Sequence, residues 1–159
     1  MKSSFDTPAG RTLIIGFGDP LHGDDGVGWQ VASLLASSLK DHETDIRIAM
    51  QLAPDMVEPV SHAELVIFID TAHDAHPGEW TCEEIFPGAD MRAHSCHEGD
   101  ALRLMEFSRL IFHSRPRAVL VSIGAKFFES SNHLMRVTEE VVPKVVRFVR
   151  EMVAELNAA

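Results

Sequence analysis

Short runs of aliphatic and β-branched residues alternate along the chain with longer segments of helical periodicity. The clearest run is Glu64–Asp70 (ELVIFID), in which consecutive apolar residues end in a carboxylate. Near-continuous apolar runs of this kind are typical of strands buried on both faces of a sheet. Strands that alternate with helices indicate an α/β/α sandwich of three layers, whose central sheet is mostly parallel.

The pattern predicts nine elements in a single domain over residues 1–159, with no repeat or linker. Strands are expected at 12–17, 45–51, 64–70, 80–85 and 117–124, and helices at 27–40, 54–60, 99–112 and from about 138 onward. The turn Pro77-Gly78 precedes the fourth strand, so this strand is expected to run antiparallel at an edge. Asp24 or Asp25 could cap the first helix, and Thr138 is expected to cap the last.

Composition and charge argue against some partners and locations. The chain has 159 residues and a formal net charge of −10, which disfavours nucleic acid and anionic membranes as partners. No apolar run is long enough to span a bilayer, and the start lacks the apolar stretch of a signal peptide. Two cysteines, Cys82 and Cys96, make no disulfide framework, so a cytoplasmic location is expected.

Three polar segments follow predicted strands or precede a predicted helix: Asp19–Asp25, Asp70, and the segment His94–His97. Ligands of open parallel sheets bind at the carboxyl ends of the strands, where these segments would meet. Two carboxylates and an imidazole could hold zinc, nickel, iron or manganese there. Each residue also has an ordinary alternative role, as a helix cap, a strand end or a loop histidine.

A nucleotide site and a cysteine nucleophile are the weaker alternatives. Gly16-Phe-Gly18 begins a dinucleotide-binding pattern, but Leu21 stands where that pattern needs glycine. The aspartates of the same loop would repel a pyrophosphate, whereas they favour a cation. Cys96 lies between histidines in the sequence, but sequence neighbours rarely have the geometry of a nucleophile and its base.

Three motifs carry a resemblance to a known family. Ile14–Gly28 (IIGFGDPLHGDDGVG) resembles the N-terminal signature of the hydrogenase maturation endopeptidases, and Leu65–Asp70 resembles their second motif. His94, followed by Asp100 and Leu102, resembles the third. The similarity covers nearly the whole chain. Two departures are Asp19, where the family has asparagine, and the segment 51–55, where many members have a glycine-rich turn.

The resemblance implies a nickel-dependent endopeptidase that removes the C-terminal extension of a [NiFe]-hydrogenase large-subunit precursor after nickel insertion. It implies a five-stranded mixed sheet and places the metal-binding positions on Asp25, Asp70 and His94, with His97 as the alternative to His94. The nickel would be presented by the precursor, and zinc or another divalent metal could bind the isolated protein. Asp25 or Asp24 could serve as a general base.

Two other functions fit the same three ligands. One is a non-catalytic nickel-sensing chaperone for the same precursor. The other is a general metallopeptidase or amidase with its own tightly bound zinc.

Overall fold

Five strands form one mixed sheet in the order β2-β1-β3-β5-β4 in the computed structural model, which describes residues 11–39, 41–88 and 96–158. The strands are β1 (Thr12–Phe17), β2 (Thr44–Ala49), β3 (Leu65–Ala72), β4 (Trp80–Ile85) and β5 (Arg117–Gly124). All pairings are parallel except that of β4 with β5, which is antiparallel. The predicted mixed sheet is confirmed, with the strand after Pro77-Gly78 as its antiparallel edge.

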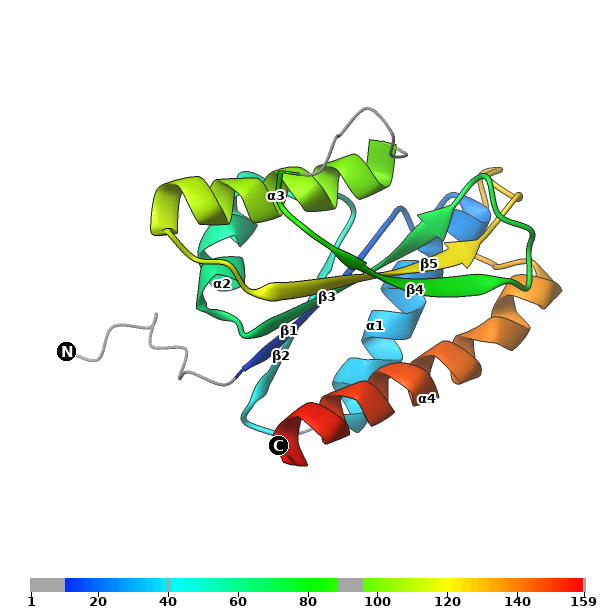
Figure 1. Cartoon of the computed structure of the whole chain (residues 1–159). Coiled ribbons are helices and arrows are strands. Elements are labelled where there is room, and N and C mark those ends of the chain that lie inside the picture. Colours follow the sequence, from blue (N-terminus) through cyan, green and yellow to red (C-terminus); the bar gives the residue numbers. More distant parts are fainter. Residues whose placement is uncertain (1–10, 40, 89–95, 159) are drawn as a thin grey trace.

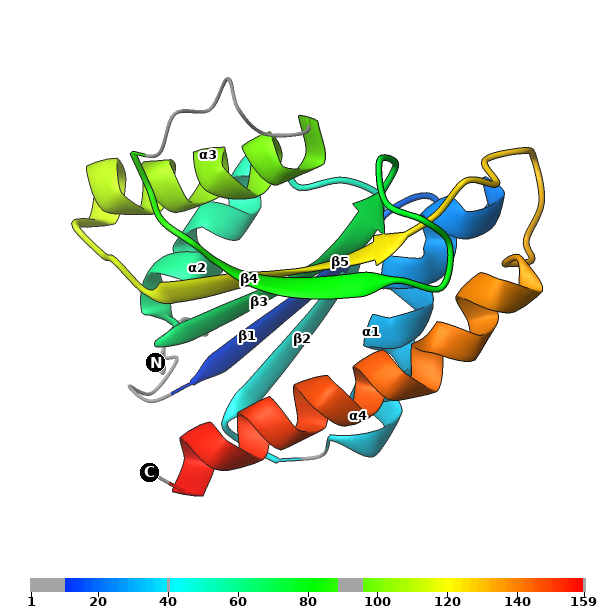
Figure 2. The ribbon, with the colours of Figure 1, turned by 45° about the vertical axis from the view of Figure 1, so that its right-hand side comes forward.

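Helices cover both faces of this sheet. Figures 1 and 2 show α2 (Val57–His62) and α3 (Cys96–Phe112) on one face, with α1 (Val27–Ser38) and α4 (Arg136–Ala158) on the other. Two short 3-10 helices, η1 (Gly23–Gly26) and η2 (Pro54–Met56), lead directly into α1 and α2. The three-layer architecture expected from the alternating pattern is therefore confirmed.

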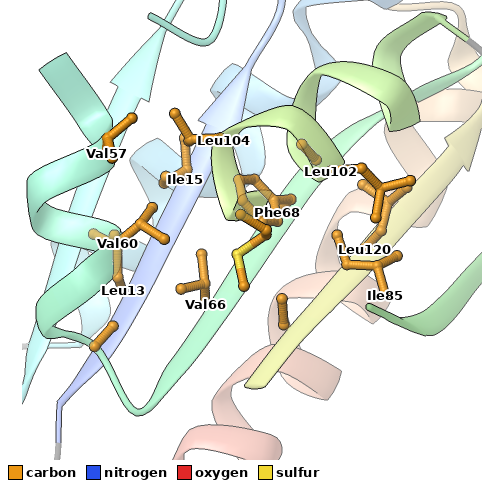
Figure 3. Close-up of a cluster of buried hydrophobic side chains, with 14 of the residues drawn as sticks. Leu13, Ile15, Val57, Val60, Val66, Phe68, Ile85, Leu102, Leu104 and Leu120 are labelled. Carbon is orange, nitrogen blue, oxygen red and sulfur yellow. The ribbon is translucent and has the colours of Figure 1, made fainter. Parts of the chain in front are cut away.

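Side chains of successive strand residues point to opposite faces and build two separate cores. In β3, Val66 and Phe68 pack with α2 and α3, whereas Ile67 and Ile69 pack with α1 and α4. Figure 3 shows the first of these cores, with Phe68 beneath Leu102 of α3. Each fully buried side chain of this size contributes about 1.5–3 kcal/mol to folding. The inner strands β1, β3 and β5 are mostly apolar because helices cover both of their faces, whereas the outer strands β2 and β4 carry charged residues and are partly exposed.

The helix α4 is amphipathic. Its buried residues recur at helical spacing, as Val141, Val145, Val149 and Val153 illustrate, while charged residues occupy the opposite face. Within the described residues, no helix combines the length and the apolar character that crossing a membrane would require.

Several boundaries differ from the sequence expectations. β3 continues two residues beyond Asp70, and α3 begins at Cys96, three residues before the expected start. The prediction that Thr138 caps the last helix is wrong, because α4 begins at Arg136. The predicted capping of the first helix by Asp24 or Asp25 is also wrong. The residue before α1 is Gly26, which has no side chain to cap the helix, and Asp24 and Asp25 lie within η1.

Candidate functional site

The carboxyl ends of β1 and β3 lie side by side at one edge of the sheet. Gly16 of β1 is in register with Ile69 of β3, so the residues that follow each of them also meet there. On β1 these lead into the loop that carries Asp25, and on β3 the next residue is Asp70. The structure thus brings the first two predicted metal-binding segments to the same edge, where ligands of parallel sheets bind.

Two glycines let the Asp25 segment approach the strands closely. At Gly28, a Cβ would lie 2.5 Å from the carbonyl oxygen of Ile69 and 2.7 Å from that of Phe17. Gly18 has a φ of +142°, and a Cβ there would overlap the carbonyl oxygen of Asp25. The glycines of the N-terminal motif therefore seat the start of α1 directly on β1 and β3.

Asp25 and Asp70 meet around one hydroxyl group. Thr71 Oγ1 lies 3.3 Å from Asp25 Oδ1 and 3.4 Å from Asp70 Oδ1. The other oxygen of Asp25, Oδ2, accepts a hydrogen bond of 2.8 Å from the backbone N–H of Asp19. Asp70 is only 1% exposed and Thr71 only 4%. Two of the three predicted ligands are thus brought together in a largely buried place.

The chemistry of this pair fits a cation. Placing two carboxylates close together away from water costs free energy, because their charges repel and burial penalises the ionised form. A divalent metal would offset both costs, and carboxylate oxygens with one imidazole form a donor set suited to nickel or zinc. In the part of the chain that the structure describes, no three His, Cys, Asp or Glu side chains are grouped to hold a metal.

The predicted third ligand, His94, lies outside the described residues. The alternative ligand, His97, is the second residue of α3. α3 ends at Phe112, shortly before β5 begins, so its first turn is directed toward the carboxyl edge of the sheet. By strand alternation, Asp70 points to the face that α3 covers. The assignment of the imidazole ligand stays a prediction.

Asp24 has a different role from Asp25. It is 0% exposed, and its Oδ1 and Oδ2 accept hydrogen bonds from the Met135 N–H (2.7 Å) and the Thr138 hydroxyl (2.9 Å). Its own N–H donates to the carbonyl oxygen of Phe127 at 2.7 Å. Asp24 therefore ties η1 to the beginning of α4. Because both oxygens of Asp24 already accept buried hydrogen bonds, Asp25 is the better of the two candidates for a general base.

Asp19 organises the loop on the other side of Asp25. Its Oδ1 accepts a hydrogen bond of 2.9 Å from the Leu21 N–H, and its Oδ2 lies 2.6 Å from His22 Nδ1. The Leu21 N–H chiefly, and then the His22 ring, lower the pKa of the Asp19 carboxyl below its ordinary value. Asp19 therefore stays ionised while its backbone N–H holds Asp25.

Sequence reasoning did not identify Thr71 as part of this site. The only local signal is a hydroxyl residue directly after the carboxylate of the apolar run. Its importance depends on the distant Asp25 segment, which no local pattern includes. The nearby His73, which precedes His76 by three residues, stacks on Phe128 with ring centroids 4.2 Å apart.

Of the comparisons with known proteins, the one with solved structures finds the same fold. No family model and no curated protein matches the sequence. Among solved structures, the hydrogenase maturating endopeptidase HybD from E. coli superposes with a TM-score of 0.75 at 17% identity, over 91% of this chain and 93% of that one. The [NiFe] hydrogenase maturation protease HycI from Thermococcus kodakarensis gives 0.74 at 20% identity, over 91% and 92%.

A third solved structure, the hydrogenase 2 maturation peptidase from a Thaumarchaeota archaeon, gives a TM-score of 0.64 at 25% identity. It covers 90% of this chain and 97% of its own. The resemblance seen in the three sequence motifs therefore extends to the whole three-layer architecture. The chain has the fold of the hydrogenase maturation endopeptidases.

Proposed function

We propose that the chain is a nickel-dependent endopeptidase that removes the C-terminal extension of a [NiFe]-hydrogenase large-subunit precursor after nickel insertion. Support comes from the shared fold, over about nine-tenths of the chain, with solved structures that are named as hydrogenase maturation proteases. The proposed compartment is the cytoplasm.

One observation carries the proposal beyond the fold. Asp25 and Asp70 are far apart in the sequence, yet both lie within reach of the Thr71 hydroxyl at the carboxyl edge of the sheet. These are the two carboxylates that the sequence motifs assign to metal binding. A pair of carboxylates brought together from distant segments at the carboxyl edge of a parallel sheet is typical of a functional site.

The residues would act by recognising a metal-loaded substrate. Asp25 and Asp70, together with the histidine predicted at position 94, would contact the nickel that the precursor already holds. Only a precursor with installed nickel would then complete the contact, so cleavage would follow metal insertion. Asp25, which is half-buried rather than fully buried, is the candidate to take a proton from an attacking water.

Mass spectrometry of the precursor tests the proposal directly. Nickel-loaded and nickel-free large-subunit precursor are each incubated with the protein, and the mass of the precursor is followed over time. The expected result is loss of the C-terminal extension from the nickel-loaded form alone. A matched pair of variants, Asp70→Ala and Asp74→Ala, tests the site, since Asp74 is an exposed residue in the turn after β3.

The outcomes separate the three functions. Binding of the nickel-loaded precursor without any mass change would contradict the proposal and favour an assembly chaperone. Cleavage of both precursor forms by a protein that carries a full equivalent of zinc would favour a general metallopeptidase. Cleavage by the Asp70→Ala variant at the rate of the unchanged protein would remove the metal role of Asp70.

A further inference from the structure

The hydroxyl of Thr71 stands between the two candidate ligands. Its oxygen is 3.3 Å from Asp25 Oδ1 and 3.4 Å from Asp70 Oδ1, and the residue is 4% exposed. A hydroxyl has one proton to donate, so it bonds one of these carboxylates at a time. Both distances exceed the usual length of an O–H···O bond, as expected for a donor set between two acceptors.

The position of Thr71 is fixed by the sheet. It lies within β3 and is in register with Ile123 of β5, in the interior of the five-stranded sheet. Threonine is branched at Cβ, which restricts its χ1 rotamers. The sheet and the restricted rotamers therefore fix the place of the hydroxyl relative to Asp25 in η1.

Asp25 is held by this hydroxyl and by one backbone donor. Thr71 approaches its Oδ1, and the Asp19 N–H donates to its Oδ2 at 2.8 Å. Each carboxylate oxygen has two acceptor positions, so one on each oxygen stays available to a metal. This arrangement orients the carboxylate before any metal arrives, which lowers the ordering cost of binding.

We propose that Thr71 is a positioning residue for metal binding, whose hydroxyl sets the relative orientation of the Asp25 and Asp70 carboxylates. The proposal rests on the metal role given to these carboxylates in the proposed function. Hydrogen-bond partners of metal ligands typically contribute about 10–100-fold to metal affinity. The same factor is expected here for a divalent cation that both carboxylates contact.

The test is the affinity of the whole protein for Ni²⁺ alone, measured by calorimetric titration. Thr71→Val keeps the shape of the side chain and removes the donor, so Ni²⁺ affinity is expected to fall by about 10–100-fold. Thr71→Ser restores the hydroxyl and is expected to bind close to the unchanged protein. Circular dichroism of each variant establishes that the fold is retained.

Thr12→Val is the matched control. Thr12 begins β1, is 0% exposed, and its hydroxyl has no hydrogen-bond partner among the described residues. It is in register with Leu65, the first residue of β3, and so lies at the end of the sheet opposite the carboxylates. The same substitution there is expected to leave Ni²⁺ affinity unchanged.

Three results would overturn the proposal: no measurable Ni²⁺ binding by the unchanged protein, equal or tighter binding by a folded Thr71→Val variant, or equal losses in Thr71→Val and Thr71→Ser. Precursor cleavage is measured separately, so the two proposals can fail independently. If the unchanged protein cleaves the precursor but Thr71→Val binds Ni²⁺ normally, only the positioning role of Thr71 is contradicted. If Thr71→Val loses Ni²⁺ affinity but the unchanged protein leaves the precursor intact, only the proposed peptidase function is contradicted.

Discussion

The side chains of Asp24 and Thr138, 114 residues apart in the sequence, are joined by a buried hydrogen bond of 2.9 Å. The second oxygen of Asp24 accepts from the Met135 N–H at 2.7 Å, so the carboxylate anchors the start of α4. Because Asp25 is the next residue, this anchor also fixes the backbone that carries a candidate metal ligand. Asp24 therefore couples the stability of the start of α4 to the position of Asp25.

Replacing Thr138 with valine is expected to lower the free energy of unfolding by about 1–3 kcal/mol, because a buried carboxylate loses one of its donors. Urea denaturation of the variant measures this change. Thr12→Val is again the control, since its buried hydroxyl has no partner among the described residues. Equal stability of the two variants would show that the bond to Asp24 contributes nothing.

Replacing Gly18 with alanine is expected to displace Asp25. The backbone at Gly18 has a φ of +142°, and an added Cβ would overlap the Asp25 carbonyl oxygen. A cost of about 1–3 kcal/mol in stability should accompany a loss of Ni²⁺ affinity. Denaturation and calorimetry measure the two effects.

Gly99→Ala serves as the control for Gly18→Ala. Gly99 lies in α3, where an added Cβ meets none of the described atoms within 4 Å. Alanine is favoured over glycine in a helix by about 0.5–1 kcal/mol, so this variant should be more stable. A Gly18→Ala variant that binds Ni²⁺ as well as Gly99→Ala does would contradict the role given to the glycine.

Replacing Asp70 with alanine is expected to abolish precursor processing and leave the fold intact. The side chain is nearly buried beside Asp25, so its removal relieves repulsion between like charges rather than opening the core. Circular dichroism and the precursor mass assay measure the two properties. Asp74→Ala, at an exposed position, should process precursor normally, and equal loss of activity in both variants would point away from Asp70.

Sequence patterns predicted the layers and the strand positions well, because most strands are buried on both faces. Runs such as 65–69 and 118–121 must be apolar to lie between two helical layers, and this requirement is local to each run. The antiparallel edge was also predictable, since Pro77-Gly78 leaves no room for a crossover helix before β4. Metal candidates followed from the position of carboxylates at strand ends.

Local patterns did not predict which donors each carboxylate would take. Asp24 and Thr138 were both expected to cap helices near them in the sequence, but they bond each other instead. Thr71 was missed for a similar reason, because its partner Asp25 lies 46 residues away. A capping propensity describes how a side chain bonds to backbone groups near it in the sequence. In these two cases a buried hydrogen bond to a residue far away in the sequence takes its place.

The pKa of Asp19 supports a pH-dependent test of the loop. Its folded-state pKa is lowered, chiefly by the Leu21 N–H and also by His22. The ionised carboxylate therefore contributes stability above the unfolded-state pKa, and this contribution is lost as the pH falls through the lower folded-state pKa. Carboxyl-carbon NMR titration should find Asp19 ionised below the pH at which an ordinary aspartate becomes protonated.

His22→Ala provides the comparison for this titration. It removes the smaller cause and keeps the Leu21 N–H, so the pKa of Asp19 should rise toward its ordinary value without reaching it. Titration of Asp19 at or above the ordinary value in the unchanged protein would contradict the hydrogen-bond geometry of the loop.

The two histidines that could supply the third ligand differ in their place relative to α3. His97 is the second residue of this helix, which begins earlier than the sequence pattern predicted. Backbone N–H groups make a helix start electropositive, which disfavours a cation there by about 0.3–1 kcal/mol. His94, whose spacing to Asp100 and Leu102 resembles the third motif of the family, is therefore the expected ligand.

Nickel affinity of His94→Ala and His97→Ala separates these assignments. His94→Ala should lose most Ni²⁺ binding, because an imidazole ligand is replaced by a methyl group. His97→Ala should keep Ni²⁺ binding and slow precursor cleavage, as expected if the histidine at position 97 is not the ligand but contributes to substrate binding. The measurement is calorimetric titration near neutral pH, where an imidazole is mostly unprotonated and can bind a metal. Loss of nickel in His97→Ala alone would reverse the assignment and place the ligand within the first turn of α3.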